Sequence, residues 1–146
     1  RSALVINSIL AKMTFLLQKE VVDRMAAAPD TPDYGRLSVM LQARFKVTKL
    51  FTVPPGAFQP PPKVDSAIVR LVPLPAADVP YRDAKVFAEV VARAFGQRRK
   101  TLRNTLKGRV DEALFAELGI DPRRRGETLS VAEFAALSNR LQPLAG

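Results

Sequence analysis

The stretch KVTKLFTVPPGAFQPPPKVDSAIVRLVPL, residues 46–74, decides the fold of the first half of the chain. Its two ends, 46–53 and 64–74, are rich in β-branched residues, which predicts two strands. Between them, the prolines and glycine at 54–56 predict a turn, and the prolines at 60–62 cannot donate ladder hydrogen bonds. The segment before the second strand is therefore expected to be a stiff extended loop that carries Phe58 near its start.

Two short apolar runs precede this stretch, at Ala3–Ile6 and Met13–Leu17. Both are short enough to be strands buried on both faces, as in a parallel sheet. Apolar residues at 21, 22 and 25 then follow helical spacing, and a second helical pattern covers 36–45. We therefore expect an α/β arrangement whose strands belong to a larger sheet.

Beyond the proline-containing linker at 73–80, every periodic segment is helical. Asp83 is placed to cap a first helix, and Ser130 with Glu133 matches a capping box that opens the last one. The expected helices begin after Asp83 and cover 98–107, 112–118 and 130–141. The pattern predicts an α/β unit at residues 1–75 and an all-α unit at residues 76–146.

The balance of charge is strongly basic, with 23 Lys and Arg against 14 Asp and Glu and a formal net charge of +9. It indicates a polyanionic partner, a nucleic acid or an anionic membrane surface, although a basic domain without such a partner has the same composition. Cysteine and histidine are absent, which excludes disulfides, thiolate metal sites, His-based triads and most zinc sites. No apolar run approaches the roughly 20 residues of a membrane span and no secretory signal is visible, so we expect a cytoplasmic protein that needs no membrane. No metal cofactor is expected.

Positive charges gather in two segments of the second half. No acidic residue lies between 98 and 110, and in a continuous helix Arg99, Arg103 and Lys107 share one stripe at spacings of four. One interpretation is a solvated helix face; the other is neutralisation by phosphates, which offsets the repulsion between like charges. The candidate phosphate-binding residues, which become candidate RNA-binding residues if the polyanion is RNA, are Arg98, Arg99, Lys100, Arg103, Lys107, Arg123, Arg124 and Arg125.

Phe58 has two interpretations from its context. An aromatic ring at the start of a rigid, exposed loop loses little entropy on binding, and enzymes that modify a base must extrude it and hold it by stacking. The alternative is that Phe58 fills a core position between sheet and helix. Periodicity alone favours the core position.

Four segments carry a resemblance to a known family: LLQKEVVDRM at 16–25, YGRLSV at 34–39, VPPGAFQPPPKVDSAIVRL at 53–71 and FGQRRKTLRNTL at 95–106. In sequence and in order they resemble the ribosomal RNA adenine dimethyltransferases, whose loss in bacteria confers kasugamycin resistance. The resemblance implies the last strands and helices of a Rossmann-like methyltransferase sheet at 1–75, followed by a small helical RNA-binding domain at 76–146. It also implies S-adenosylmethionine as methyl donor, bound mainly by segments upstream, so that no donor-binding residue is expected in this portion.

Two site residues follow from the same resemblance. Phe58 matches the family position that stacks on the target adenine, and Asn7 falls where the family has a catalytic tetrapeptide of Asn, an aliphatic residue, Pro and an aromatic. The sequence here reads Asn7-Ser8-Ile9-Leu10, which departs from that tetrapeptide after its first residue.

The function implied is dimethylation of adenine N6 in 16S ribosomal RNA during small-subunit biogenesis. The expected partner is this RNA or the immature small subunit, the expected state is a monomer, and the 146-residue portion alone is expected to be inactive. A non-catalytic assembly factor or transcription factor of the same family is the alternative. An anion-binding helical module unrelated to methyltransferases is a third interpretation.

Overall fold

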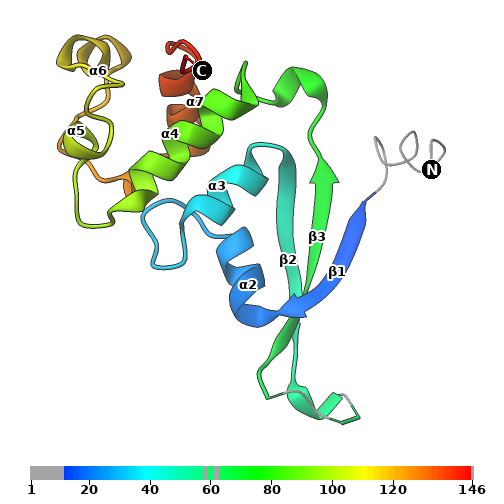
Figure 1. Cartoon of the computed structure of the whole chain (residues 1–146). Coiled ribbons are helices and arrows are strands. Elements are labelled where there is room, and N and C mark those ends of the chain that lie inside the picture. The colour runs from blue at the N-terminus through cyan, green and yellow to red at the C-terminus, as the bar shows by residue number, and fades with distance from the viewer. Residues whose placement is uncertain (1–11, 58, 61–62, 146) are drawn as a thin grey trace.

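Three strands form one antiparallel sheet in the first half of the molecule (Figure 1). The structure is a computed structural model that describes residues 12–57, 59–60 and 63–145. β1 (Met13–Gln18) and β2 (Phe45–Val53) flank β3 (Ser66–Pro73), which gives the order β1-β3-β2. α2 (Lys19–Met25) and α3 (Arg36–Gln42) lie on one side of this sheet.

The expectation that Met13–Leu17 is a parallel strand buried on both faces is wrong for the part of the chain described. β1 pairs antiparallel with β3, and β3 is its sole neighbour among the described strands. Phe15 and Leu16 remain 43% and 46% exposed. The apolar run has the composition of a central strand, but in this structure it lies at a sheet edge with helices on one face only.

The register separates a covered face from an open one. Leu17 is paired with Ala67 and Met13 with Leu71, and these residues pack with Val22 of α2 in one core cluster. The alternate residues Leu16, Ile68 and Phe51 are cross-strand neighbours on the opposite face. A register shift between Lys49 and Phe51 sends Phe51 to that open face, where it is 58% exposed.

The second half is helical, as the sequence predicts. Its helices are α4 (Ala84–Gly96), α5 (Leu102–Thr105), α6 (Glu112–Leu118) and α7 (Val131–Ser138). Short 3-10 turns are η2 (Ala76–Asp78) and η3 (Gly126–Thr128) in this half and η1 (Pro55–Ala57) between β2 and β3. No helix in the described residues is long and apolar enough to cross a membrane.

Local capping signals in this half are confirmed. The Asp83 carboxylate accepts hydrogen bonds from the first turn of α4, and Ser130 and Glu133 form the capping box of α7. Gly119 ends α6 in the left-handed region, with φ of 69°. α7 ends at Ser138, three residues before the predicted end at Leu141.

The predicted helix over 98–107 is wrong, and with it the stripe of Arg99, Arg103 and Lys107. α4 stops at Gly96 and α5 has four residues, so Arg99 precedes α5 and Lys107 follows it. The chain turns here because Leu102 and Leu106 are fully buried. The backbone N–H groups of residues 102 and 103 donate to the carbonyls of Arg124 and Pro122, at 2.8 and 2.9 Å, so this segment docks on the loop before α7.

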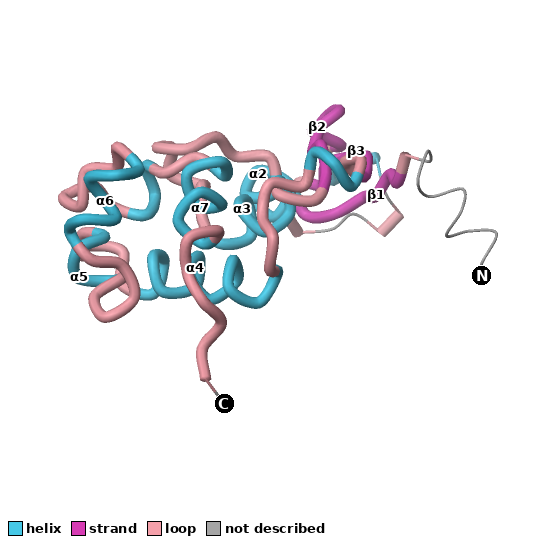
Figure 2. Tube along the Cα trace, turned by 90° about the horizontal axis from the view of Figure 1, so that it is seen from above, coloured by secondary structure: helices cyan, strands magenta, loops and turns pink. Residues whose placement is uncertain are grey.

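One apolar core crosses from the first half into the second. Tyr34, Val39 and Ala43, from α3 and its approach, belong to the same buried cluster as Phe87, Phe134 and their neighbours in the helical half. The Tyr34 hydroxyl donates to the Leu129 carbonyl at 2.6 Å. α3 therefore packs against both the sheet and the helices (Figures 1 and 2).

The close packing of η3 against α4 gives a test of this core. A Cβ added at Gly126 would lie 2.8 Å from the Ala94 carbonyl oxygen and 2.9 Å from the Ala94 Cβ. Since backbone must shift to relieve that overlap, we expect Gly126→Ala to lower the free energy of unfolding by about 1–3 kcal/mol in chemical denaturation. Gly96→Ala is the control, because a Cβ at Gly96 meets nothing within 4 Å; equal stability of the two variants would contradict this packing.

Candidate nucleic-acid interface

The two residues singled out for base capture, Phe58 and Asn7, lie outside the described residues. The surroundings of the Phe58 loop are described, however. β2 ends at Val53, the turn η1 follows, and the chain re-enters the sheet at Ser66. The Lys19 backbone N–H donates to the Asp65 carbonyl at 2.9 Å, which joins the start of α2 to the end of this loop.

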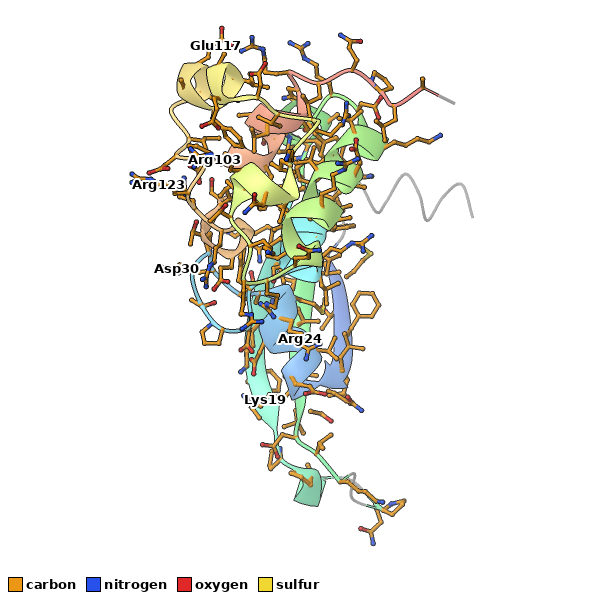
Figure 3. All side chains as sticks on the ribbon, turned by 60° about the vertical axis from the view of Figure 1, so that its left-hand side comes forward. Lys19, Arg24, Asp30, Arg103, Glu117 and Arg123 are labelled. Atoms are coloured by element: carbon orange, nitrogen blue, oxygen red, sulfur yellow. The ribbon has the colours of Figure 1, made fainter. Side chains whose placement is uncertain are left out.

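A polar cluster joins α2 to the sheet beside the loop. Asp23 on α2 accepts from Lys19 at 2.7 Å and from Lys49 on β2 at 2.9 Å. These hydrogen bonds hold the pKa of Asp23 below its ordinary value, and the bond from Lys19 has the larger effect. Lys19 lies at the end of α2 that is nearer the loop (Figure 3). The cluster ties α2 to the strand that leads into the Phe58 loop, so the base of the loop is fixed.

The fold brings the two predicted basic segments together. The bonds from residues 102 and 103 to the carbonyls at 124 and 122 place the loop after α4 beside the loop before α7. Sequence spacing alone did not predict this, because the segments are separated by α6. All of the candidate RNA-binding residues except Arg124 are exposed.

Arg103 and Arg123 lie close together at one edge of the helical half (Figure 3). Arg103 pairs with Glu112 at 2.7 Å, and Arg123 pairs with Asp121 at 2.9 Å. The Arg123 side chain lowers the pKa of the Asp121 carboxyl to about 2. Exposed pairs of this kind contribute little to stability, so a phosphate can replace either carboxylate at small cost.

Arg124 points inward, unlike its neighbours. Its guanidinium donates to both Glu133 carboxylate oxygens, at 2.7 and 3.1 Å, and to the Thr128 carbonyl at 2.7 Å. These bonds hold the pKa of Glu133 below its ordinary value of 4.5, and Glu133 in turn caps α7. Arg124 therefore stabilises the fold at the start of α7.

The remaining candidates occupy turns. Arg98, Arg99 and Lys100 lie between α4 and α5, Lys107 follows α5, and Arg125 precedes η3. Arg98 donates to the Tyr34 carbonyl at 3.3 Å, while none of these five forms an ion pair with a described residue. They form a charged surface over the two docked loops, which suits binding to a phosphate backbone.

Two differences from the sequence analysis concern arginines. Arg109, inside the acid-free segment, is 12% exposed at its side chain and pairs with Glu89 at 2.7 Å, so it is held in the helical half. Arg24 and Arg36 were not singled out, because neither belongs to a basic run, yet both line a cavity with Arg98. Only the folded chain brings them together.

The sequence profile described as ribosomal RNA adenine dimethylase matches residues 4–143. The chain is 64% identical over 127 residues to the ribosomal RNA small subunit methyltransferase A of Aromatoleum aromaticum, covering 87% of this chain and 48% of that protein. It is 61% identical over 132 residues to the protein of that name from Xanthomonas campestris pv. campestris, covering 90% and 50%. The chain thus spans about half the length of the curated relatives it matches.

Two solved structures share the fold. A dimethyladenosine transferase from Plasmodium falciparum is similar with a TM-score of 0.75 and 24% identity, over 93% of this chain and 61% of that one. The 23S rRNA methyltransferase ErmE is similar with a TM-score of 0.57 and 26% identity, over 96% and 60%.

The contrast between Arg124 and Arg125 gives a matched test. We expect Arg124→Gln to lower the free energy of unfolding at neutral pH by about 1–2 kcal/mol, because it removes charge-assisted hydrogen bonds in a half-buried site. Arg125→Gln should change stability by less than about 0.5 kcal/mol. Chemical denaturation measures both, and similar losses would contradict the inward role of Arg124.

The Arg124–Glu133 pair also predicts how the free energy of unfolding depends on pH. The folded-state pKa of Glu133 is lowered, so its stabilising effect is present above its ordinary value of 4.5 and is lost as the pH falls through the lower folded value. Arg124→Gln should therefore have a shallower loss of stability in that acid range than the parent protein. A parallel acid profile in the two proteins would show that the Arg124–Glu133 bonds do not couple to folding.

Proposed function

Because the chain belongs to the ribosomal RNA adenine dimethylase family, we propose that it is part of an enzyme that dimethylates N6 of adenines in 16S ribosomal RNA. The observation that carries the proposal is the 64% identity to a protein named ribosomal RNA small subunit methyltransferase A. The basic surface formed by two docked loops supports it, since an RNA substrate needs phosphate contacts.

The sheet is proposed to be the last part of a Rossmann-like sheet, with the division at residues 1–75 and 76–146. β1 has an edge without a described neighbour, and the face with Leu16, Ile68 and Phe51 carries exposed apolar side chains. A sheet with such a face is normally covered by another layer. On this proposal, α3 belongs to the first domain and packs on the second.

The methyl donor is proposed to be S-adenosylmethionine, held by parts of the complete protein other than the residues described here. Ligand sites in α/β sheets lie beyond the carboxyl ends of strands, which for β1 is the cavity beside Lys19 and Asp65. Its volume is about 260 Å³ and its lining is mostly charged. This cavity is below the ordinary range for a small-molecule site, so the described residues do not fit the donor by themselves.

Phe58 is proposed to stack on the target adenine after it leaves the RNA stack, and Asn7 to contact its exocyclic amine. The loop of Phe58 ends at Asp65, which is bonded to Lys19 of the Lys19–Asp23–Lys49 cluster, and this contact anchors one end of the loop. Holding the base in a defined position aligns its nitrogen for methyl transfer.

The test is a methyl-transfer assay with the complete protein that contains these residues, radiolabelled donor and small ribosomal subunits lacking the modification. We expect incorporation into adenine, and we expect Phe58→Ala to reduce it by about 5- to 150-fold, the factor equivalent to about 1–3 kcal/mol of stacking per base. Phe58→Tyr is the matched control, since it keeps an aromatic face.

Two results would contradict the proposal separately. Absence of donor-dependent incorporation by the parent protein would reject the enzyme and leave a binding factor. Normal turnover of Phe58→Ala, with parent activity intact, would return Phe58 to the role of a core residue. Thermal unfolding of each variant shows whether a loss of activity comes from a loss of fold.

A further inference from the structure

A cleft between the two halves of the molecule is lined by three arginines from separate elements. Arg24 lies in the last turn of α2, Arg36 opens α3, and Arg98 follows α4. The cavity they line measures about 420 Å³, and Asp33 contributes the one carboxylate to its lining. Arg24 lies on α2, away from the edge that carries Arg103 and Arg123 (Figure 3).

The walls of this cleft are held by hydrogen bonds that cross from one element to the next. The buried Ser38 hydroxyl donates to the Arg24 carbonyl and accepts from the Gly35 N–H, so the end of α2 is tied to the start of α3. Gln42 donates to the Met25 and Ala27 carbonyls at 2.9 and 2.8 Å. Arg98 reaches across from α4 to the Tyr34 carbonyl. These bonds hold the end of α2 against the start of α3 and the Arg98 guanidinium against Tyr34.

The charges in this cleft are not balanced by the protein. Three guanidinium groups face one carboxylate, and in the described part of the chain none of the three forms an ion pair. Several arginines elsewhere, among them Arg103, Arg109, Arg124 and Arg140, do have a carboxylate partner. Cationic side chains that line one cavity without a carboxylate partner repel one another, and an anion bound among them reduces that repulsion.

We propose that this cleft binds one backbone phosphate of the ribosomal RNA, with Arg24, Arg36 and Arg98 as its guanidinium ligands. A phosphodiester is favoured over a free anion because Arg98 also begins the exposed segment 98–100, so the cleft continues the basic surface of the helical half. The cleft extends that surface onto α2 and α3. The inference rests on the proposed function, because it names a second contact with the same RNA.

The experiment measures binding of a labelled 16S ribosomal RNA helix to the complete protein by fluorescence anisotropy over a series of salt concentrations. Arg24→Gln/Arg36→Gln should weaken binding by about ten-fold or more at low salt, since each hydrogen bond between charged groups is worth a factor of about ten. The slope of log affinity against log salt should become shallower by about 0.7–0.9, the value for one neutralised phosphate. Arg44→Gln/Arg82→Gln is the matched control, because it removes the same two positive charges from exposed positions outside the cleft.

Two further variants separate phosphate binding from a loss of fold. Arg24→Lys/Arg36→Lys should keep the parent salt slope while losing part of the affinity, because lysine retains the charge without the planar fork. Asp33→Asn should strengthen binding at low salt, with a gain that shrinks as salt is raised, because it removes the carboxylate that opposes the anion. A merely structural role predicts neither result.

The outcomes are distinguishable. If the parent binds this RNA and the double Gln variant binds it with the same affinity and slope, the cleft is not a phosphate site, while the proposed function stands. If the parent shows no binding, both are overturned. Titration with inorganic phosphate, monitored through the NMR signals of the arginine side chains, shows whether the cleft binds a free anion. Saturation at a low phosphate concentration, together with RNA binding that the variants leave unchanged, would assign a free-anion site and reject the RNA contact.

Discussion

The hydrogen bond from the buried Tyr34 hydroxyl to the Leu129 carbonyl is the constraint on which the arrangement of the two halves depends. Tyr34 comes just before α3, and Leu129 comes just before the capping box of α7. Burial raises the pKa of Tyr34, which favours the neutral hydroxyl that donates this hydrogen bond. Its ring packs edge-on to Phe95, which in turn lies against Phe134. Removing this donor would leave a carbonyl in the core without a partner.

The same residue links packing to charge. The Tyr34 backbone carbonyl accepts from Arg98, the first residue of the exposed basic segment. The fold then divides the arginines of this basic chain into two populations. Arg109 and Arg124 are held by Glu89 and Glu133 and stabilise the helical half, whereas those in the turns around α5 remain at the surface. The net charge alone does not distinguish these populations, because the carboxylate partners are distant in the sequence.

How much the sequence predicts depends on how local each signal is. The Asp83 cap, the Gly119 end and the Ser130–Glu133 box are determined within a few residues, and all three are confirmed. The helix predicted over 98–107 fails because the buried Leu102 and Leu106 dock on a loop that comes later in the chain. Phe51 lies on the open face because the register of β2 shifts between Lys49 and Phe51, and a simple alternation of inward and outward residues does not predict such a shift. The roles of Phe58 and Asn7 stay predictions, since they lie outside the described residues.

A shared core between sheet and helices has a consequence for RNA binding. The Phe58 loop connects β2 to β3, while the basic turns follow the carboxyl end of α4, so the proposed base capture and the proposed phosphate contacts belong to different elements. If a flexible linker joined these elements, binding of RNA to both would cost the conformational entropy of bringing them into one arrangement. α3 instead packs on both, with Val39 and Ala43 in the helical core and Leu41 against the sheet cluster. The relative position of the two proposed contacts is therefore set by the fold, and on the proposed function the binding free energy of the basic surface can be used to position the base.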